Sequence, residues 1–238
     1  VTASGAISGL GNLTLADVGG TATFSNNVAA AALTANNTVA NITFTGSTNT
    51  FSAASTLAND GTLTFGNAAG DSFTFNGGVT ETTTGTVTLA SAISSSNDAI
   101  SFGAVTLGSN TTIDTNATNT TGDITIGAVT GGNNTLTLTT ENNVANTDVT
   151  ANGTIAGVTT LTLLNVGGTA TLSADVDVTT LTVGNTVANL IFTGNGSSVA
   201  NAVSFVNDGT LTLGQDGGTQ TYNGGLNTTN VGGVVTLN

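Results

Sequence analysis

Short segments in which apolar residues alternate with threonine recur along almost the whole chain, at intervals of roughly ten residues. A period of two places the apolar side chains on one face of an extended strand and threonine on the other. Clusters of Gly, Asn and Asp separate these segments, and such residues end strands because they tolerate positive φ. The chain is therefore predicted to be all-β. The predicted strands include 13–15, 42–44, 63–65, 73–75, 87–89, 124–126, 136–138, 161–163 and 181–183.

A long internal repeat contains these short segments. When Val149 is aligned with Val1, nearly half of the following positions are identical, as far as Leu237 on Leu89. The sequence NDGTLTFG at 59–66 returns as NDGTLTLG at 207–214. In this motif we expect Asn-Asp-Gly to form a turn, the leucines to fill the core and the threonines to face outward. We interpret 1–238 as a single continuous β-solenoid, with a long repeat at 1–148 and a partial second copy at 149–238.

Many short strands at regular spacing permit a sandwich, a barrel or a β-solenoid. Uniformly short strands, and aliphatic or Phe side chains that can stack in rows, favour a solenoid whose coils lie about 4.8 Å apart. At roughly 20 residues per coil, the chain would form about a dozen coils. The predicted fold is a right-handed parallel β-helix, since right-handed connection is the default for parallel strands. Antiparallel β-sandwich domains in tandem are the alternative. The helix-like run 29–33 aligns with a strand pattern at 177–181 and is predicted to be a strand.

The residue types that are missing exclude several classes of function. The chain contains no Lys, Arg, His or Cys, and its formal net charge is −13. Without Lys or Arg nothing neutralises phosphates, so we expect neither nucleic-acid binding nor direct binding to anionic membranes. Without His, Lys or Cys there is no base for a nucleophilic triad and no thiol chemistry. We therefore expect the protein not to be an enzyme.

A pair of carboxylates is the one catalytic arrangement that this composition still permits, and it would suit glycoside hydrolysis. Asp175 and Asp177 lie two apart in a predicted strand, so both should point outward about 7 Å apart. Their repeat equivalents are Asn27 and Ala29, which excludes a site common to both copies. A carbohydrate-active or carbohydrate-binding β-helix stays open as an alternative function, but we assign no catalytic residue.

Calcium is the one metal ion that the composition suits, because it takes carboxylate and carbonyl oxygens. Asp60 and Asp208 occur in both copies of the repeat, but each belongs to an Asn-Asp-Gly turn that accounts for it. No EF-hand or calcium-binding roll motif occurs. We therefore assign no metal-binding or cofactor-binding residue and expect no cofactor, with Ca²⁺ as a weak alternative.

Rows of outward threonine suggest a further function. Thr135, Thr137 and Thr139 share one predicted strand face, as do Thr210 and Thr212. On a solenoid such a grid can order water, so ice binding is a lower-ranked alternative. Threonine is also the polar residue best suited to strands, which explains the rows without a ligand. The lone tyrosine, at 222, is expected to pack at the edge of a coil.

Segments such as TGDITIGAVT at 121–130 and GTLTL at 209–213 resemble the strand repeats of large bacterial surface proteins, the filamentous-haemagglutinin-like exoproteins and autotransporter passengers. The resemblance covers nearly the whole chain and implies a right-handed β-helix on, or released from, a Gram-negative cell surface. It also implies adhesion or matrix building, although the family's members commonly contain the Lys and Arg that this chain lacks. We expect an extracellular, non-catalytic structural or adhesive protein that self-associates into fibres or filaments, with surface glycans as further partners.

Overall fold

The computed structural model describes residues 1–116, 118–119, 121–140, 144–215 and 217–238. Its secondary structure is all β, and its strands stack in parallel as a β-solenoid of about eleven coils. Every strand pairing among the described residues is parallel; for example, Leu63 and Phe65 pair with Val87 and Leu89. The predicted solenoid is therefore confirmed, and the antiparallel sandwich alternative is wrong. The described residues contain no helix that is long and apolar enough to span a membrane.

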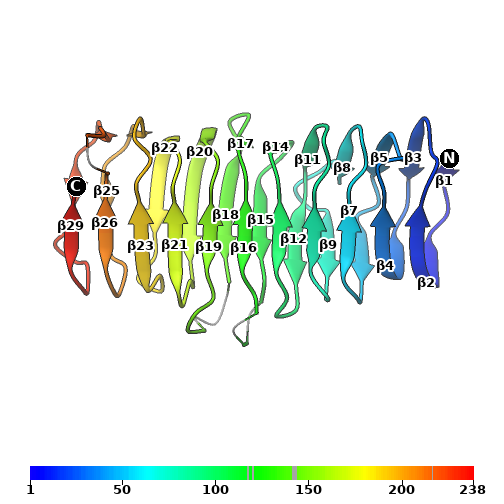
Figure 1. Cartoon of the computed structure of the whole chain (residues 1–238), viewed down its shortest axis with the longest axis horizontal. Helices are drawn as coiled ribbons and strands as arrows, with labels where there is room; N and C mark the ends of the chain where they lie inside the picture. The colour runs from blue at the N-terminus through cyan, green and yellow to red at the C-terminus, as the bar shows by residue number, and fades with distance from the viewer. Residues whose placement is uncertain (117, 120, 141–143, 216) are drawn as a thin grey trace.

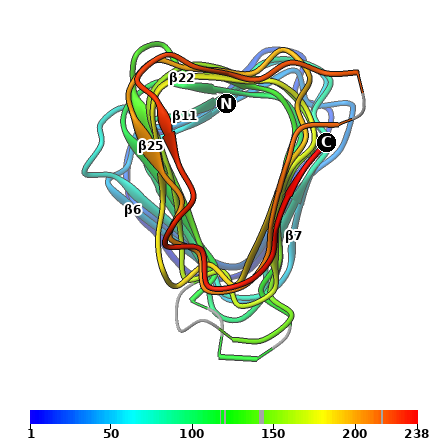
Figure 2. The same cartoon turned by 90° about the vertical axis from the view of Figure 1, so that its left-hand side faces the viewer.

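Each coil contributes one strand to each of three faces, so that the cross-section is a rounded triangle (Figure 2). Four long strands turn a corner and belong to two faces. Face A contains β1 (Thr2–Ala3), β3 (Thr21–Phe24), β5 (Asn41–Phe44), β8 (Leu63–Phe65), β11 (Val87–Leu89), β14 (Val105–Leu107), β17 (Val129–Thr130), the first parts of β20 (Ile155–Leu164) and β22 (Val176–Val183), β24 (Ser198–Val199) and β27 (Thr221–Tyr222).

Face B follows face A along the chain, and face C follows face B. Face B contains the first parts of β2 (Ile7–Leu15) and β4 (Val28–Ala35), then β6 (Thr48–Phe51), β9 (Ser72–Phe75), β12 (Ala92–Ser95), β15 (Thr111–Asp114), β18 (Thr135–Thr139), the second parts of β20 and β22, β25 (Val203–Ser204) and β28 (Leu226–Asn227). Face C contains the second parts of β2 and β4, then β7 (Ser55–Leu57), β10 (Val79–Glu81), β13 (Ile100–Phe102), β16 (Ile124–Ile126), β19 (Val149–Ala151), β21 (Thr169–Leu172), β23 (Asn189–Phe192), β26 (Leu211–Leu213) and β29 (Val235–Leu237).

The chain winds in one sense from end to end. Figure 1 places the N-terminus and the C-terminus at opposite ends of the rod, with face C toward the viewer. Seen from the C-terminal end in Figure 2, the chain runs anticlockwise through faces A, B and C as it approaches the viewer. The solenoid is therefore right-handed, as the general preference of parallel connections predicts.

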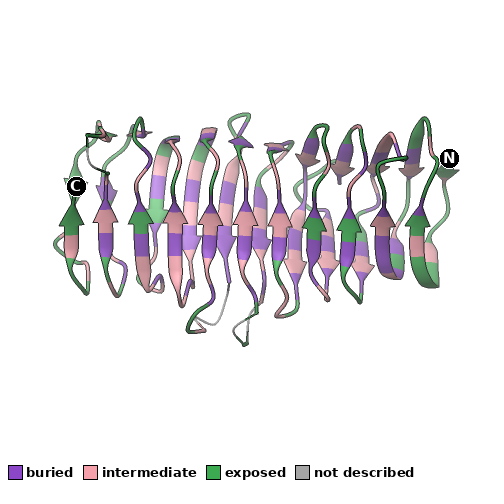
Figure 3. Cartoon of the chain, viewed as in Figure 1, coloured by how far each residue is buried: buried purple, intermediate pink, exposed green. Residues whose placement is uncertain are grey.

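The core is formed by the apolar residues of the alternating pattern, and Figure 3 shows buried and partly exposed positions alternating along the strands. Phe44 is fully buried and stacks on Phe24 with ring centroids 4.7 Å apart. Phe65 continues the row 6.1 Å from Phe44. The strands predicted from the alternation all occur, including the helix-like run at 29–33, which lies within β4. At about 4.8 Å per coil the rod is about 50 Å long.

The two copies of the long repeat have the same local backbone. Gly9 and Gly157 are repeat equivalents with φ values of 68° and 69°, and each lies at a bulge in a long strand. The copies do not lie on the same face, however. Gly9 lies in the face B part of β2, between Ile7 and Leu10, whereas Gly157 lies in the face A part of β20, between Ala156 and Val158. The second copy is therefore rotated by one third of a turn relative to the first.

The Asn-Asp-Gly turn has the predicted form in the second copy. Leu211 and Leu213 are 0% and 4% exposed, whereas Thr210 is exposed and Thr212 is partly exposed. Asn207 is buried, and its side-chain nitrogen Nδ2 donates to the Thr210 carbonyl oxygen at 2.8 Å. The turn is thus closed by its own asparagine.

Candidate functional surfaces

A continuous ladder of outward side chains, ten of them Thr or Ser and one Ile, runs along face C. One residue from each coil points outward, is partly or fully exposed, and pairs in register with the next along the rod. We call these residues the face C ladder, and it contains no charged side chain. The ladder consists of Thr14, Thr34, Thr56, Thr80, Ser101, Thr125, Thr150, Thr171, Ile191, Thr212 and Thr236.

The equivalent ladder on face A is uniform only in its first seven coils, from Thr2 to Thr130. It then continues as Ala156, Asp177 and Ser198, so it carries a carboxylate. The outward positions of face B are mixed, and Asp114 lies among them. Face C is therefore the most regular of the three faces.

Two of the predicted outward threonines on β18 belong to a small grid on face B. Thr135 and Thr137 are partly exposed, and their counterparts in the next coil are Thr160 and Thr162. Thr139, by contrast, is only 7% exposed. The expectation of an outward Thr139 is wrong, because this residue lies at the end of the strand and accepts a hydrogen bond at 3.4 Å from a side chain of the next coil. The grid ends one coil further on, at β22.

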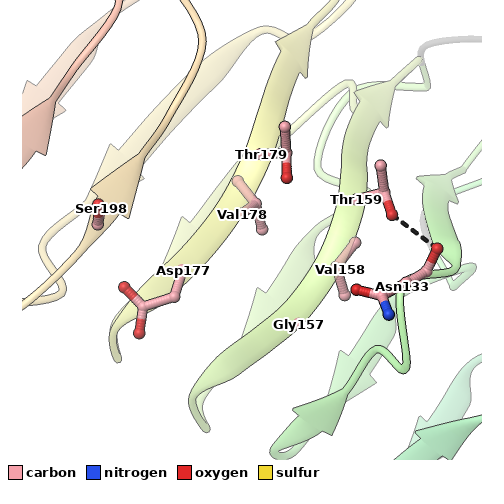
Figure 4. A pocket seen from close by; sticks show the side chains of 8 residues that line it. All are labelled: Asn133, Gly157, Val158, Thr159, Asp177, Val178, Thr179 and Ser198. Carbon is pink, nitrogen blue, oxygen red and sulfur yellow. Dashed lines mark hydrogen bonds between the residues drawn. The ribbon is translucent and has the colours of Figure 1, made fainter.

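Two open grooves lie at the glycine bulges, at repeat-equivalent positions. The groove at the first bulge measures about 290 Å³, and the groove at the second measures about 190 Å³ (Figure 4). We call them the apolar groove and the polar groove, because Ala29 in the first is replaced by Asp177 in the second. The apolar groove is lined by Gly9, Leu10, Ala29, Ala30, Ala31, Thr50 and Ser52. The polar groove is lined by Asn133, Gly157, Val158, Thr159, Asp177, Val178, Thr179 and Ser198.

The two aspartates of the candidate carboxylate pair have different surroundings. Asp177 is exposed on β22 and lines the polar groove. Asp175 precedes the strand, and its Oδ1 accepts a hydrogen bond from the Gly196 backbone nitrogen at 2.7 Å. The expectation that both lie on one strand face is wrong. Asp175 stabilises a turn of the next coil, and Asp177 alone lines the groove.

The aspartates of the two Asn-Asp-Gly turns have a structural role in the first copy. Asp60 accepts a hydrogen bond from the Thr84 hydroxyl at 2.9 Å, while Asp208 is exposed in the equivalent turn. Among the described residues, no three carboxylates gather closely enough to hold a metal ion. The geometry of these turns therefore adds nothing to the calcium alternative.

A buried carboxylate was not singled out by the sequence pattern. Glu81 is 3% exposed and occupies an inward position of β10, where the neighbouring coils have Leu57 and Phe102. Its Oε2 accepts from the Gly103 backbone nitrogen at 3.0 Å, and its Oε1 accepts from that of Thr83. The sequence does contain a signal for this residue: in the alternating pattern of β10 (Val, Thr, Glu), the glutamate occupies an inward position. Because backbone donors bind both oxygens, we regard Glu81 as a structural residue.

Tyr222 lies in the last coil and packs against buried aromatic rings, as expected. Its ring centroid lies 6.5 Å from that of Phe192 and 6.3 Å from that of Phe205. Its hydroxyl donates to Gln220 Oε1 at 3.0 Å. Burial raises the pKa of Tyr222 above its usual value. This residue stabilises the end of the stack through packing.

Comparisons with models of known protein families, with curated proteins and with solved structures find no match to this chain. The function must therefore be inferred from the solenoid and its surfaces.

Proposed function

We propose that the chain is a non-catalytic structural segment, a rigid rod within an extracellular fibre, filament or matrix. The observation that carries this proposal is the continuous stack of about eleven coils with one strand of each coil on every face. Backbone hydrogen bonds join each coil to the next along the rod, as from Ile42 to Thr62 and from Leu63 to Thr86. Such a stack resists bending, because bending must disturb three parallel ladders at once.

The chemistry of the chain supports a mechanical role. There is no Lys, Arg, His or Cys to act as a base or nucleophile, and trypsin has no cleavage site. The described carboxylates that are buried, such as Glu81 and Asp71, bind backbone nitrogens of turns. Both properties suit a protein that persists outside the cell. The resemblance to strand repeats of large bacterial surface proteins supports the same location and an adhesive or matrix-building role.

Self-association is the part of this proposal that concerns partners. Large apolar side chains are exposed in the first and last coils, including Leu10, Leu226 and Leu237. A further coil stacked on either end, from the same polypeptide or from another copy, would cover these side chains and pair the outer strand edges. We therefore propose end-to-end stacking of coils as one route to a filament.

A carbohydrate-binding role is the second candidate function, and one observation favours it. The polar groove offers the Asp177 carboxylate beside the hydroxyls of Thr179 and Ser198. Carboxylate and hydroxyl oxygens are suitable acceptors for sugar hydroxyls. The groove is open and contains no aromatic ring, so we rank this function below the structural one. Ice binding ranks third, because the threonine grid on face B spans only three coils.

Electron microscopy of the purified protein tests the structural proposal. Straight rods about 50 Å long, or filaments built from them, are the expected result. Isolated globular particles that cleave polysaccharides would overturn it. An assay of glycan binding with Asp177→Ala, using Ala29→Asp as the reciprocal change in the apolar groove, separates the second candidate from the first.

A further inference from the structure

The outward ladder positions of face C are free of charged side chains along the whole rod. None of the eleven ladder positions is a carboxylate, whereas Asp177 and Asp114 occupy ladder positions on faces A and B. The corners that border face C do carry carboxylates. The corner before face C contains Asp98, Asp123, Asp148 and the exposed Asp208, and the corner after it contains Asp175 and the exposed Asp17 and Asp60. Asp123 and Asp148 are bound in place: Asp123 Oδ1 accepts from the Asp148 backbone nitrogen at 2.9 Å, and Asp148 Oδ1 accepts from that of Thr169 at 2.7 Å.

The hydroxyls of the ladder are available to a partner. Within the described part of the chain, no hydroxyl of the face C ladder has a hydrogen-bond partner in the protein. Threonines at the corners differ, because Thr62 and Thr210 both donate to an asparagine of the preceding coil at 2.9 Å. The face C hydroxyls therefore bond only to solvent or to a surface that approaches the face.

One apolar side chain interrupts the ladder. Ile191 is 36% exposed, and the other large apolar residues with comparable exposure in the described regions all belong to the first or last coil. It lies between Thr171 and Thr212 in the register of face C. Its repeat equivalent is Thr43, which the rotation of the second copy places on face A. An isoleucine thus replaces a threonine in the ladder that has no charged side chain.

The size and period of face C suit a second copy of the chain. Eleven rungs about 4.8 Å apart and about four residues wide make a strip of about 53 by 13 Å, or roughly 700 Å². Two such strips bury about 1,400 Å² in total, within the range of about 1,200–2,000 Å² for stable protein interfaces. A second solenoid has the same rung spacing, so its hydroxyls stay in register with the first along the whole strip.

We propose that two copies of this chain pair laterally, face C against face C. The paired ladders exchange hydroxyl hydrogen bonds, and Ile191 of each copy is covered by the other. The pairing rests on the proposed structural function, for which it supplies the lateral contact. A ladder of Thr and Ser is not by itself a strong interface, and Ile191 is its apolar anchor.

The rotated repeat provides a matched control for testing this pairing by sedimentation velocity. Ile191→Asp places a carboxylate on face C, and Thr43→Asp places one at the equivalent position on face A. We expect the wild-type chain and Thr43→Asp to pair, and the dissociation constant of Ile191→Asp to rise about tenfold or more. Equal unfolding midpoints for the two variants would show that both solenoids are intact. Equal dissociation constants for the two variants would overturn the proposal.

A single cysteine gives a second test, because the chain has none of its own. Thr125 lies in the sixth of the eleven rungs of face C, and Thr106 lies on face A in the same coil. We expect mild oxidation to link Thr125→Cys into a covalent dimer and to leave Thr106→Cys monomeric. Cross-linking of both or of neither would overturn the pairing. If electron microscopy shows rods but sedimentation shows that they are monomeric, only the lateral contact is rejected. If electron microscopy shows no rods, the structural function itself is rejected.

Discussion

Thr83 donates a hydrogen bond from its hydroxyl to the buried amide oxygen of Asn59 at 3.0 Å, in the coil directly below. The repeat equivalents of this pair are Val231 and Asn207. Valine cannot donate, and the side-chain oxygen of Asn207 is buried without a hydrogen-bond partner among the described residues. The second copy thus keeps the turn asparagine but has lost the hydroxyl that satisfies it.

Val231→Thr is therefore expected to stabilise the last coils. The change is nearly isosteric and supplies the missing donor, which is worth about 1 kcal/mol. Urea unfolding of the variant against the wild-type chain measures the gain. The reciprocal Thr83→Val leaves the oxygen of Asn59 buried and unpaired, and a loss of about 1–3 kcal/mol is expected. No gain from Val231→Thr would mean that the Asn207 oxygen already has a partner such as water.

The aromatic core of the early coils is expected to contribute more stability than its repeat equivalent. Phe65 is fully buried, and its ring centroid lies 5.0 Å from that of Phe73 and 6.0 Å from that of Phe102. Phe65→Ala should lower the free energy of unfolding by about 3–5 kcal/mol. The equivalent Leu213 lies one coil from the C-terminal end, so Leu213→Ala should cost less, about 2 kcal/mol. Hydrogen exchange resolved by coil shows whether each substitution destabilises only its own coils or the whole rod. Equal losses of unfolding free energy in Phe65→Ala and Leu213→Ala would contradict the expectation.

A glycine in a stacked turn is expected to be irreplaceable. A Cβ on Gly46 would lie 2.4 Å from the backbone carbon and oxygen of Asn26 in the coil below. Gly46→Ala must separate two coils and should destabilise the protein by about 1–3 kcal/mol. Gly19→Ala is the control, because a Cβ there has open space. Thermal unfolding of the two variants makes the comparison, and similar midpoints would show that the coils separate without cost.

Strand positions could be predicted from the sequence because each strand needs only a local alternation. Leu63, Thr64 and Phe65 show the pattern, with the threonine outward and its neighbours buried. The face on which a strand lies was not predictable in the same way. The face depends on the summed lengths of all preceding turns, and these lengths vary. Neighbouring coils are 20 residues apart at Thr23 and Thr43 on face A, but 25 residues apart at Thr125 and Thr150 on face C.

That variation explains what sequence reasoning missed at the candidate surfaces. Thr64 and Thr212 are equivalent in the repeat, but they lie on faces A and C because the 148-residue period is not a whole number of coils. The uncharged ladder of face C is visible only after every strand has been assigned to a face. The unpaired state of Asn207 was likewise hidden, since it depends on a residue in the next coil.

Tyr222 reports on the last coil, because it is the only tyrosine and the chain has no tryptophan. Burial raises the pKa of its hydroxyl in the folded state above the value near 10 of an exposed tyrosine. The folded protein therefore holds this proton at a pH where the unfolded chain releases it. The contribution of Tyr222 to the free energy of unfolding is therefore fully present below about pH 10 and decreases as the pH rises above that value.

The tyrosinate absorbance is accordingly expected to appear at higher pH in the native protein than in urea. Its onset should coincide with loss of protection from hydrogen exchange in β27 and β29, since ionisation requires the coil to open. The Tyr222→Phe variant keeps the ring packing against Phe192 and Phe205 but has no hydroxyl to ionise. Its free energy of unfolding should therefore fall less than that of the wild-type chain as the pH rises above about 10. A native chain that titrates near pH 10 with its last coil still protected would contradict this account of the residue.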